Sequence, residues 1–425
     1  MITLADNSKA REVLGWEPRI SLKNAIKDLK KFHGLGDEQV IIPDNEKPRV
    51  LIFSIAYEPL IGGAELAVRY ITDRLLSYEF DLVTCRFDSK HKPEEQIGNV
   101  HVYRIGFGNR LGRYLYPIQA ASFAKKLQHK KNYSMVWSIM AAYASAAALL
   151  FLKSFPKVKF LLTLQEGDTI EHIHKQVRGF RGKWQEIFKR ADHIQAISRF
   201  LADWARSEGA VCPIEVVPNG VDLEKFRNQP RRKVGAPTAA SENSKFVIIT
   251  TSRLVLKNGI DTLIKAAAEL KFHIPHSTFH IQILGSGPEE ENLKKLARDL
   301  KLDDLVQFYG SIEPDKIPEY LSQADIFVRP SRSEGLGTSF LEAMAAGLPV
   351  VGTPVGGIPD FLIDGVNGLF CKPEDPKDLS AKIKQLITDD ELRNRLSQNG
   401  QRSILEKYGW DGIAQQMDAI FSKLV

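Results

Sequence analysis

The sequence predicts an α/β protein with two doubly wound, Rossmann-like domains that face a central cleft. Short apolar segments rich in β-branched residues alternate with amphipathic segments along most of the chain. The alternation stops at residues 229–245, which are Pro-rich, small and polar, and then restarts. The chain has 425 residues, more than the roughly 250 to 300 at which one hydrophobic core stops growing. Two successive β/α arrays therefore predict two parallel sheets covered by helices, with a linker between them.

The first array predicts a domain over residues 46–228. Residues 49–55 form the expected first strand, and GGAELAVRYITDRLLSY, soon after it, has the apolar spacing of a helix. Further short strands are expected in the sequences FDLVTCRF, NVHVYRI, KFLLTL, HIQAIS and IEVVP.

One uncharged segment of this array, residues 132–152, is long enough to span a bilayer. Its first part, YSMVWSI, has β-type residues, whereas its second part is rich in alanine and contains a serine and a tyrosine. We expect a buried strand followed by a buried helix, because this hydropathy is weak for a membrane span.

The second array predicts a domain over residues 246–405. Its expected strands are KFVIITTSR, FHIQILG, LVQFYG and DIFVRP, and the segments between them have helical spacing. Residues 406–425 are expected to form a last helix that returns to the first domain.

A glycine turn follows the strand that ends at Pro330. Gly335 and Gly337 allow a backbone path closed to larger residues, and Ser339 with Glu342 matches the capping box that opens a helix. The first amides of a helix are unpaired and attract anions. The turn is therefore a predicted phosphate site.

Two carboxylates, Glu334 and Glu342, flank this turn although they would repel a phosphate. Carboxylates accept hydrogen bonds from hydroxyls, which are numerous on a sugar or a ribose. The stretch therefore predicts a phosphate with sugars attached. The alternative is that Glu342 only completes the capping box and Glu334 is a solvated loop residue.

Two cations, Arg253 and Lys257, lie in the loop at the carboxyl end of the strand KFVIIT, where open α/β sheets bind ligands. Arg253 can form a bidentate contact with phosphate oxygens, and Lys257 adds a point charge. Because Arg253 and Lys257 are in the same domain as the glycine turn, we expect them to contact the same phosphate from another side.

Charge and cysteine content narrow the partners and the location. Residues 101–165 contain ten Lys and Arg and no acidic residue, which fits an anionic membrane surface or a phosphorylated acceptor, with a generic solvated surface as the alternative. No nucleic-acid-binding module accompanies this charge, so no nucleic acid is expected as a partner. The three cysteines, Cys85, Cys212 and Cys371, form no cluster, and the beginning of the sequence is polar. A cytoplasmic protein, peripheral on the inner face of the membrane, is expected.

Several motifs together resemble the family 4 glycosyltransferases, which have the GT-B architecture. The resemblance covers residue 48 to the C terminus and is carried by GGAE, AISRFLADW, VPNGVD, SRLVLKNGID, ILGSGP and RPSRSEGLGTSFLEAMAAGLPVV, followed by GGIPD and DGVNGLF. The Glu-x7-Glu spacing of the long block is typical of the family.

The resemblance implies a role for each matching residue. Arg253 and Lys257 would hold the diphosphate of a nucleotide-sugar donor, Glu334 would contact the transferred sugar, and Glu342 would bind the ribose. The remaining donor-binding positions are in two glycine loops: Gly62, Gly63, Gly335, Leu336, Gly337 and Thr338. The resemblance further implies transfer with retention. No metal ion or other cofactor is expected, since no Asp-x-Asp motif occurs.

Two positions depart from the family pattern. Many relatives have the lysine directly before the glycine, whereas Asn258 stands between Lys257 and the glycine here. Many members also have a histidine after the strand that is KFLLTL here, and this chain has QEGD instead. Glu166, Asp168 and His172 are the alternatives for the acceptor side.

The first 45 residues resemble the C-terminal tail of nucleotide-sugar epimerases and dehydratases. They lack the glycine fingerprint, tyrosine and lysine of that family, so no redox chemistry is expected of them.

The predicted function is hexose transfer from a nucleotide-diphosphate sugar to a saccharide or lipid-linked acceptor, in the synthesis of a cell-surface polysaccharide or glycolipid. One alternative is a nucleotide-sugar 2-epimerase of the same fold, and another is a non-catalytic membrane-associated partner subunit. A dehydrogenase is disfavoured because GSGPEE lacks the third glycine of the dinucleotide fingerprint.

Overall fold

The first domain is built on one sheet. The chain adds strands on one side of the first strand, β1, and then continues with β5 on its other side. The computed structural model describes residues 47–60, 62–109, 111–227, 229, 246–274 and 279–425. Within them, an eight-stranded sheet has the order β3-β4-β2-β1-β5-β6-β7-β8, parallel except for β3. Its strands are β1 (Arg49–Phe53), β2 (Glu79–Cys85), β3 (Glu94–Ile97), β4 (Val100–Ile105), β5 (Met135–Ile139), β6 (Lys159–Leu164), β7 (His193–Ala196) and β8 (Ile214–Val216).

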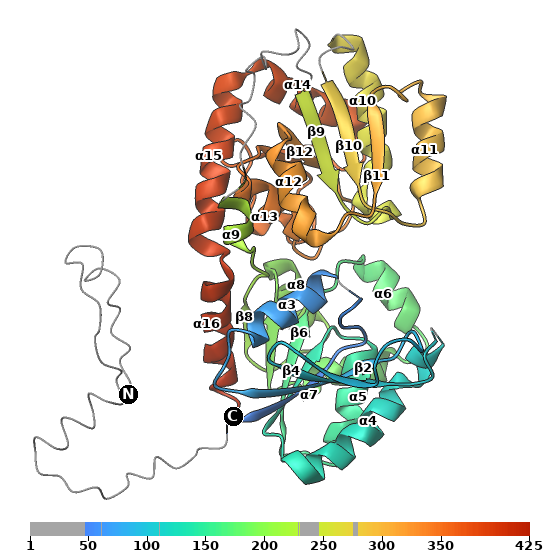
Figure 1. Ribbon diagram of the computed structural model, residues 1–425, viewed down its shortest axis with the longest axis vertical. Helices are drawn as coiled ribbons and strands as arrows, with labels where there is room; N and C mark the ends of the chain where they lie inside the picture. The colour runs from blue at the N-terminus through green and yellow to red at the C-terminus, as the bar shows by residue number, and fades with distance from the viewer. Residues whose placement is uncertain (1–46, 61, 110, 228, 230–245, 275–278) are drawn as a thin grey trace, which may run out of the picture. The chain divides into compact units, whose positions relative to one another are not determined.

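Helices connect these strands and cover the sheet (Figure 1). They are α3 (Gly63–Thr72), α4 (Gly112–Lys131), α5 (Tyr143–Leu152), α6 (Ile170–Val177), α7 (Arg181–Arg190) and α8 (Arg199–Ser207). Residues 132–152 contain the whole of β5 and of α5, so the predicted strand and helix are confirmed. No described helix is long and apolar enough to cross a membrane.

The second domain repeats the design with a six-stranded parallel sheet among the described residues, in the order β11-β10-β9-β12-β13-β14. Its strands are β9 (Phe246–Thr251), β10 (Phe279–Leu284), β11 (Val306–Gly310), β12 (Ile326–Arg329), β13 (Val350–Gly352) and β14 (Leu369–Phe370). Its helices are α10 (Ile260–His273), α11 (Glu290–Asp299), α12 (Ile317–Ser322), α13 (Thr338–Ala345), α14 (Pro376–Thr388) and α15 (Asp390–Lys407), with single 3-10 turns at Leu256–Asn258, Pro314–Lys316 and Ile358–Asp360. The predicted fold class, two doubly wound Rossmann-like domains, is confirmed.

The last helix, α16 (Trp410–Phe421), packs against the first domain, next to α3 (Figure 1). The ring of Trp410 stacks on Tyr70 at 5.0 Å between centroids, and Phe421 meets the indole of Trp137 edge-on at 5.2 Å. The apolar face of α16 therefore completes the core on that side of the first sheet.

The chain crosses between the domains at two points that lie side by side. The amide of Val221 donates to the carbonyl of Tyr408 at 2.7 Å, and Val221 forms a parallel bridge with Gly409. A Cβ on Gly220 would stand 2.8 Å from the ring of Trp410, so only glycine allows this approach. Beyond Val221, the short helix α9 (Leu223–Arg227) already packs on α12 and α13 of the second domain.

Two sequence predictions fall outside the described residues. These are the epimerase-like segment, residues 1–45, and the linker, residues 229–245 apart from Gln229.

Candidate functional site

The site lies at the points where strand order reverses in each sheet. Neighbouring strands at these points, β1 and β5 in one sheet and β9 and β12 in the other, send their connections to opposite faces. A crevice at the carboxyl ends of such strands is where open α/β sheets bind ligands. The loops after these four strands hold most of the residues that the sequence singled out.

The loop after β9 carries the two predicted cations. A short 3-10 turn, Leu256–Asn258, ends at Gly259, whose φ of 68° lies in the left-handed region. A Cβ at Gly259 would stand 1.9 Å from the carbonyl oxygen of Pro330, so glycine is required for this loop to pack on the end of β12. Arg253 and Lys257 both line the cavity described below.

Lys257 is already paired across the cleft. Its Nζ donates to Oδ1 of Asp168, in the first domain, at 2.9 Å. Burial raises the pKa of Asp168, but the hydrogen bond and charge of Lys257 outweigh it, and the pKa lies below its ordinary value. Asp168 therefore holds the lysine with an ionised carboxylate.

The glycine turn after β12 leads into α13 without the predicted capping box. The N-cap is Gly337, with a φ of 100°, and no side chain caps the helix. Ser339 instead accepts a hydrogen bond from Nη1 of Arg329 at 2.6 Å. The prediction that Ser339 and Glu342 cap each other is wrong, because left-handed Gly337 starts the helix two residues before Ser339. The N-cap Gly337 and the first helical residue Thr338, at the end of α13 where amides lack partners within the helix, line the cavity.

The glycine turn also touches the first domain. A Cβ on Gly335 would stand 2.4 Å from the carbonyl oxygen of Glu166, and the hydroxyl of Ser333 donates to the carbonyl of Gly167 at 3.2 Å. The two loops that bear the predicted donor and acceptor residues are thus in direct contact.

Glu334 is held by a buried arginine that the sequence analysis did not single out. Nη2 of Arg329 lies 2.8 Å from Oε2 of Glu334, and the two side chains are 11% and 14% exposed. The same nitrogen donates to Oδ1 of Asn258 at 2.9 Å. Arg329 therefore fixes Glu334 to the loop that carries the cations.

Glu342 lies further along α13 and is not among the residues that line the cavity. Burial raises the pKa of Glu342 to about 7, although the charges of Arg329 and Lys225 lower it in part. This carboxyl changes its charge near neutral pH.

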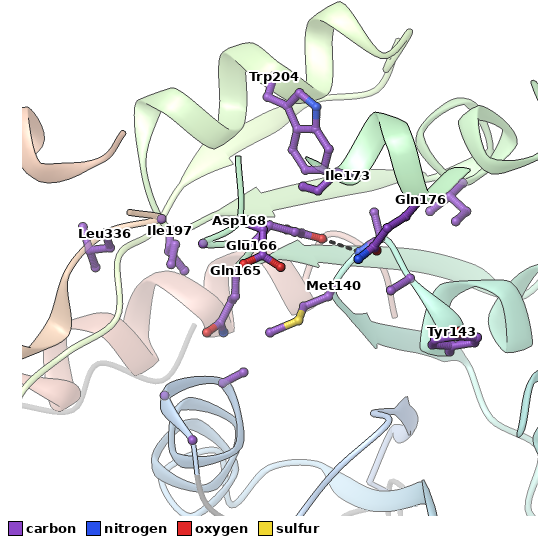
Figure 2. Close-up of a pocket in the computed structure, with 18 of the residues that line it drawn as sticks. Met140, Tyr143, Gln165, Glu166, Asp168, Ile173, Gln176, Ile197, Trp204 and Leu336 are labelled. Carbon is purple, nitrogen blue, oxygen red and sulfur yellow. Dashed lines mark hydrogen bonds between the residues drawn. The ribbon is translucent and has the colours of Figure 1, made fainter. Parts of the chain in front are cut away.

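Glu166 faces the donor loops from the first domain. Its Oε1 accepts a hydrogen bond from the amide of Ala141 at 2.6 Å, while its Oε2 is buried and has no partner among the described residues (Figure 2). Burial raises the pKa of Glu166 to about 7. An orphaned, weakly acidic carboxyl in a cavity wall is suited to receive a hydroxyl.

His172 does not join these residues. Its side chain is exposed at the start of α6, where Nε2 lies 2.8 Å from Nε2 of Gln176, and it does not line the cavity. Of the three acceptor-side alternatives, Glu166 and Asp168 line the cavity.

One cavity of about 740 Å³ brings the other predicted residues together. From the second domain it is lined by Arg253, Lys257, Glu334 and the four residues of the glycine turn, Gly335 to Thr338. From the first domain it is lined by Gly62, Gly63, Glu166 and Asp168. A Cβ on Gly63 would meet no atom within 4 Å, so this glycine leaves space open rather than relieving a contact within the protein.

The cavity continues into an apolar arm of the first domain. Figure 2 shows Met140 and Tyr143 on one side of this arm, and Ile173 and Trp204 on the other. Leu149, Val177, Phe180, Trp184 and Ile187 also line it. The cavity therefore has a polar, cationic end and an apolar end, separated by Glu166 and Asp168.

Several polar residues of the site belong to the sequence motifs but had no predicted role. Glu65 of GGAE lines the cavity, and burial raises its pKa. Asn219 of VPNGVD donates to Oε1 of Gln165 at 3.0 Å, and Asn258 of KNGID bridges to Arg329. The signal for Arg329 was an arginine at the end of an otherwise apolar strand, just before the glutamate block.

Comparison with known proteins agrees with this geometry. Residues 61–225 match the family described as Glycosyltransferase Family 4, and residues 237–403 match the family described as Glycosyl transferases group 1. Together the two matches cover most of both domains.

Relatives in sequence are glycosyltransferases. An uncharacterised glycosyltransferase of Methanocaldococcus jannaschii is 26% identical over 88% of this chain and 98% of its own length. A GDP-mannose-dependent alpha-(1-6)-phosphatidylinositol monomannoside mannosyltransferase of Mycolicibacterium smegmatis is 30% identical over 53% of this chain and 61% of its own length.

Solved structures share the fold. Sucrose-phosphate synthase from Thermosynechococcus elongatus superimposes with a TM-score of 0.76 at 21% identity, over 89% of this chain and 99% of that one. Anabaena HepE, solved in complex with UDP and glucose, superimposes with a TM-score of 0.71 at 21% identity, over 88% and 99%. The chain therefore belongs to the family 4 glycosyltransferases and is an enzyme with the GT-B fold.

Proposed function

We propose that the protein moves a hexose-type sugar, with retention, from a nucleotide-diphosphate sugar to a saccharide or lipid-linked acceptor. The reaction would serve the synthesis of a cell-surface polysaccharide or glycolipid at the cytoplasmic face of the membrane. The observation that carries the proposal is the cavity in which two cations, the first amides of α13 and Glu334 face Glu166.

The donor diphosphate would lie between Arg253, Lys257 and the amides at Gly337 and Thr338. These groups are preorganised around the place where negative charge develops when the bond from the anomeric carbon to phosphate breaks. Positive charge from the chain itself replaces a metal ion, so no metal is required. Gly63 leaves room for the diphosphate on the opposite wall, and Gly62 lets the loop pass close to the carboxylate of Glu65.

The donor sugar and nucleoside would be held by the two glutamates. Glu334, fixed by Arg329, accepts hydrogen bonds from hydroxyls of the transferred sugar. Glu342 binds the ribose one turn further along α13.

In the chemical step, the acceptor oxygen bonds to the anomeric carbon on the face that the diphosphate leaves. The acceptor proton passes to the departing phosphate oxygen, which balances the charge. Glu166 accepts a hydrogen bond from an acceptor hydroxyl through its unpartnered Oε2 and orients it.

A screen of UDP-, GDP- and ADP-sugars tests the proposal by thermal shift and by donor hydrolysis. We expect one nucleotide to stabilise the parent chain and its sugar conjugate to be hydrolysed slowly. In Glu342→Ala both effects fall, whereas Glu291→Ala, at an exposed helical glutamate, keeps them. Stabilisation by none of the three nucleotides would contradict the proposal. Epimerised nucleotide sugar formed without an acceptor would favour the 2-epimerase instead.

A further inference from the structure

An exposed apolar patch lies at the start of α4, outside the site. Among the described residues, exposed large apolar side chains are densest here, where five fall within twelve positions. They are Phe107, Leu111, Tyr114, Leu115 and Ile118, between 47% and 72% exposed. We call these five residues the α4 patch. Contiguous exposed apolar surface of this kind marks an interaction site.

The helix itself explains why the α4 patch is unusual. Leu111, Leu115 and Ile118 follow the spacing of one helical face, while Tyr116, Ala120 and Ala124 form the buried face against the first domain. The first half of α4 is thus apolar on both faces, yet one of them is exposed. A helix that is apolar all round is normally covered on all sides.

Further along, the exposed face becomes basic. Lys126 and Lys130 are exposed on α4, and Lys153 and Lys157 are exposed in the segment that follows α5, the helix that packs against α4. No acidic residue occurs between His101 and Gln165 to neutralise them. An apolar stripe that continues into lysines is the pattern of a helix that lies in the interface of an anionic membrane.

One aromatic contact links the α4 patch to the cavity. The ring of Tyr114 meets the ring of Tyr143 edge-on at 6.1 Å between centroids, and Tyr143 lines the apolar arm (Figure 2). The guanidinium of Arg113 lies 4.8 Å from the centroid of Tyr114. A tyrosine flanked by an arginine is suited to the headgroup region, where the ring is buried and the charge stays hydrated.

We propose that the α4 patch docks the protein on an anionic lipid bilayer, with Leu111, Leu115 and Ile118 inserted below the headgroups. The arm of the cavity lined by Tyr143 then opens beside the bilayer, so a lipid-linked acceptor reaches Glu166 without leaving the membrane. This last role rests on the proposed function, whereas membrane binding itself does not. A second copy of the chain could also cover an apolar face, but the adjacent lysines would then meet lysines across a symmetric interface.

Cosedimentation with lipid vesicles tests the proposal on the full chain, without donor or acceptor. We expect binding to vesicles of phosphatidylglycerol and phosphatidylcholine in equal parts, weaker binding to phosphatidylcholine alone, and a decrease with added salt. In Leu111→Ser/Ile118→Ser the affinity falls about tenfold or more, because two inserted side chains no longer leave water. Lys126→Ser/Lys130→Ser should reduce mainly the part of vesicle binding that decreases with added salt.

Controls separate this proposal from others. Phe272→Ser removes an 84% exposed aromatic residue of the second domain and keeps full vesicle binding. The Leu111→Ser/Ile118→Ser and Lys126→Ser/Lys130→Ser variants both keep the parent melting temperature and donor hydrolysis in solution. Absence of parent binding, or binding that the Leu111→Ser/Ile118→Ser variant leaves unchanged, overturns the proposal. A dimer that this variant converts to a monomer also overturns it, since a second copy would then cover the patch. Loss of donor hydrolysis in the parent would refute the proposed function and leave the vesicle result standing.

Discussion

The guanidinium of Arg329 lies 2.8 Å from the carboxylate of Glu334, and it also binds Asn258 and Ser339. The side chain of Arg329 thus contacts the glycine turn, the loop after β9 that carries Arg253 and Lys257, and the start of α13. Glu334 has its position because Arg329 holds it, not because the turn alone directs it.

Replacing Arg329 should therefore impair the chemical step more than donor binding. We expect Arg329→Met to lower kcat about a hundredfold, the scale for a small misplacement of a catalytic group, with a smaller change in donor KM. Arg329→Lys keeps the charge but not the planar fork and should recover only part of kcat. Steady-state kinetics measures the difference.

The matched control is Arg393→Met, which removes another buried arginine, on α15 and outside the cavity residues. It should lower the melting temperature and leave kcat unchanged. Equal kinetic effects of the two substitutions would show that Arg329 acts only through stability.

The pair of Lys257 and Asp168 predicts opposite effects of two substitutions. A diphosphate must compete with Asp168 for the lysine, so Asp168→Asn should raise the affinity for the nucleoside diphosphate about two- to fivefold, the worth of a half-exposed ion pair. Lys257→Met should lower that affinity. Isothermal titration calorimetry measures both, and weaker binding by Asp168→Asn would mean that this carboxylate contacts the donor favourably.

Glu342 predicts a pH-dependent stability. Its pKa rises from 4.5 to about 7 on folding, so the folded state holds the proton more tightly than the unfolded state. The contribution of Glu342 to the free energy of unfolding should therefore be fully present below pH 4.5 and be lost as the pH rises through 7. Glu166, with a pKa also raised to about 7, adds to the same fall.

Substituting Glu342→Gln should flatten part of this dependence. Melting temperatures of the parent and the variant across this pH range measure it. A parent that grows more stable between pH 4.5 and 7, with no difference between parent and variant, would contradict the assignment.

A substitution at Gly63 should weaken donor binding without affecting the stability of the fold. A Cβ there meets nothing within the protein, so Gly63→Ala should leave the melting temperature unchanged while weakening nucleotide-sugar binding. Gly412→Ala, at another open position, should change neither quantity. Unimpaired donor binding by Gly63→Ala would place the diphosphate away from this loop.

Removal of divalent cations should not affect the enzyme. In the proposed function, Arg253 and Lys257 would supply the positive charge that a metal clamp supplies in other enzymes. Donor hydrolysis measured with and without EDTA checks this, and activity lost with EDTA and restored by magnesium would contradict it.

The sequence predicted the fold well because the signals are local. The alternation of β-branched and amphipathic segments locates β1, β9 and β12, and small residues after a β-type run identify residues 132–152 as strand and helix. The positions of the glycine turn and of the two cations were predictable because these residues come directly after predicted strands in the sequence.

The contacts that complete the site were not predictable because they are distant in sequence. Asp168 and Lys257 are 89 residues apart, and Asn258 and Arg329 are 71 apart. The capping box was predicted wrongly for a local reason, since the spacing of Ser339 and Glu342 contains no sign that Gly337 starts the helix or that Arg329 donates to the serine. Only the folded chain shows which polar groups satisfy one another.

The hydrogen bond between Val221 and Tyr408 has a mechanical consequence. Because the two crossings are joined at one place, a rotation of one domain relative to the other would pivot close to Val221 and Tyr408. Such a rotation would break the contacts of Lys257 with Asp168 and of Gly335 with Glu166 together, because both contacts join the two domains.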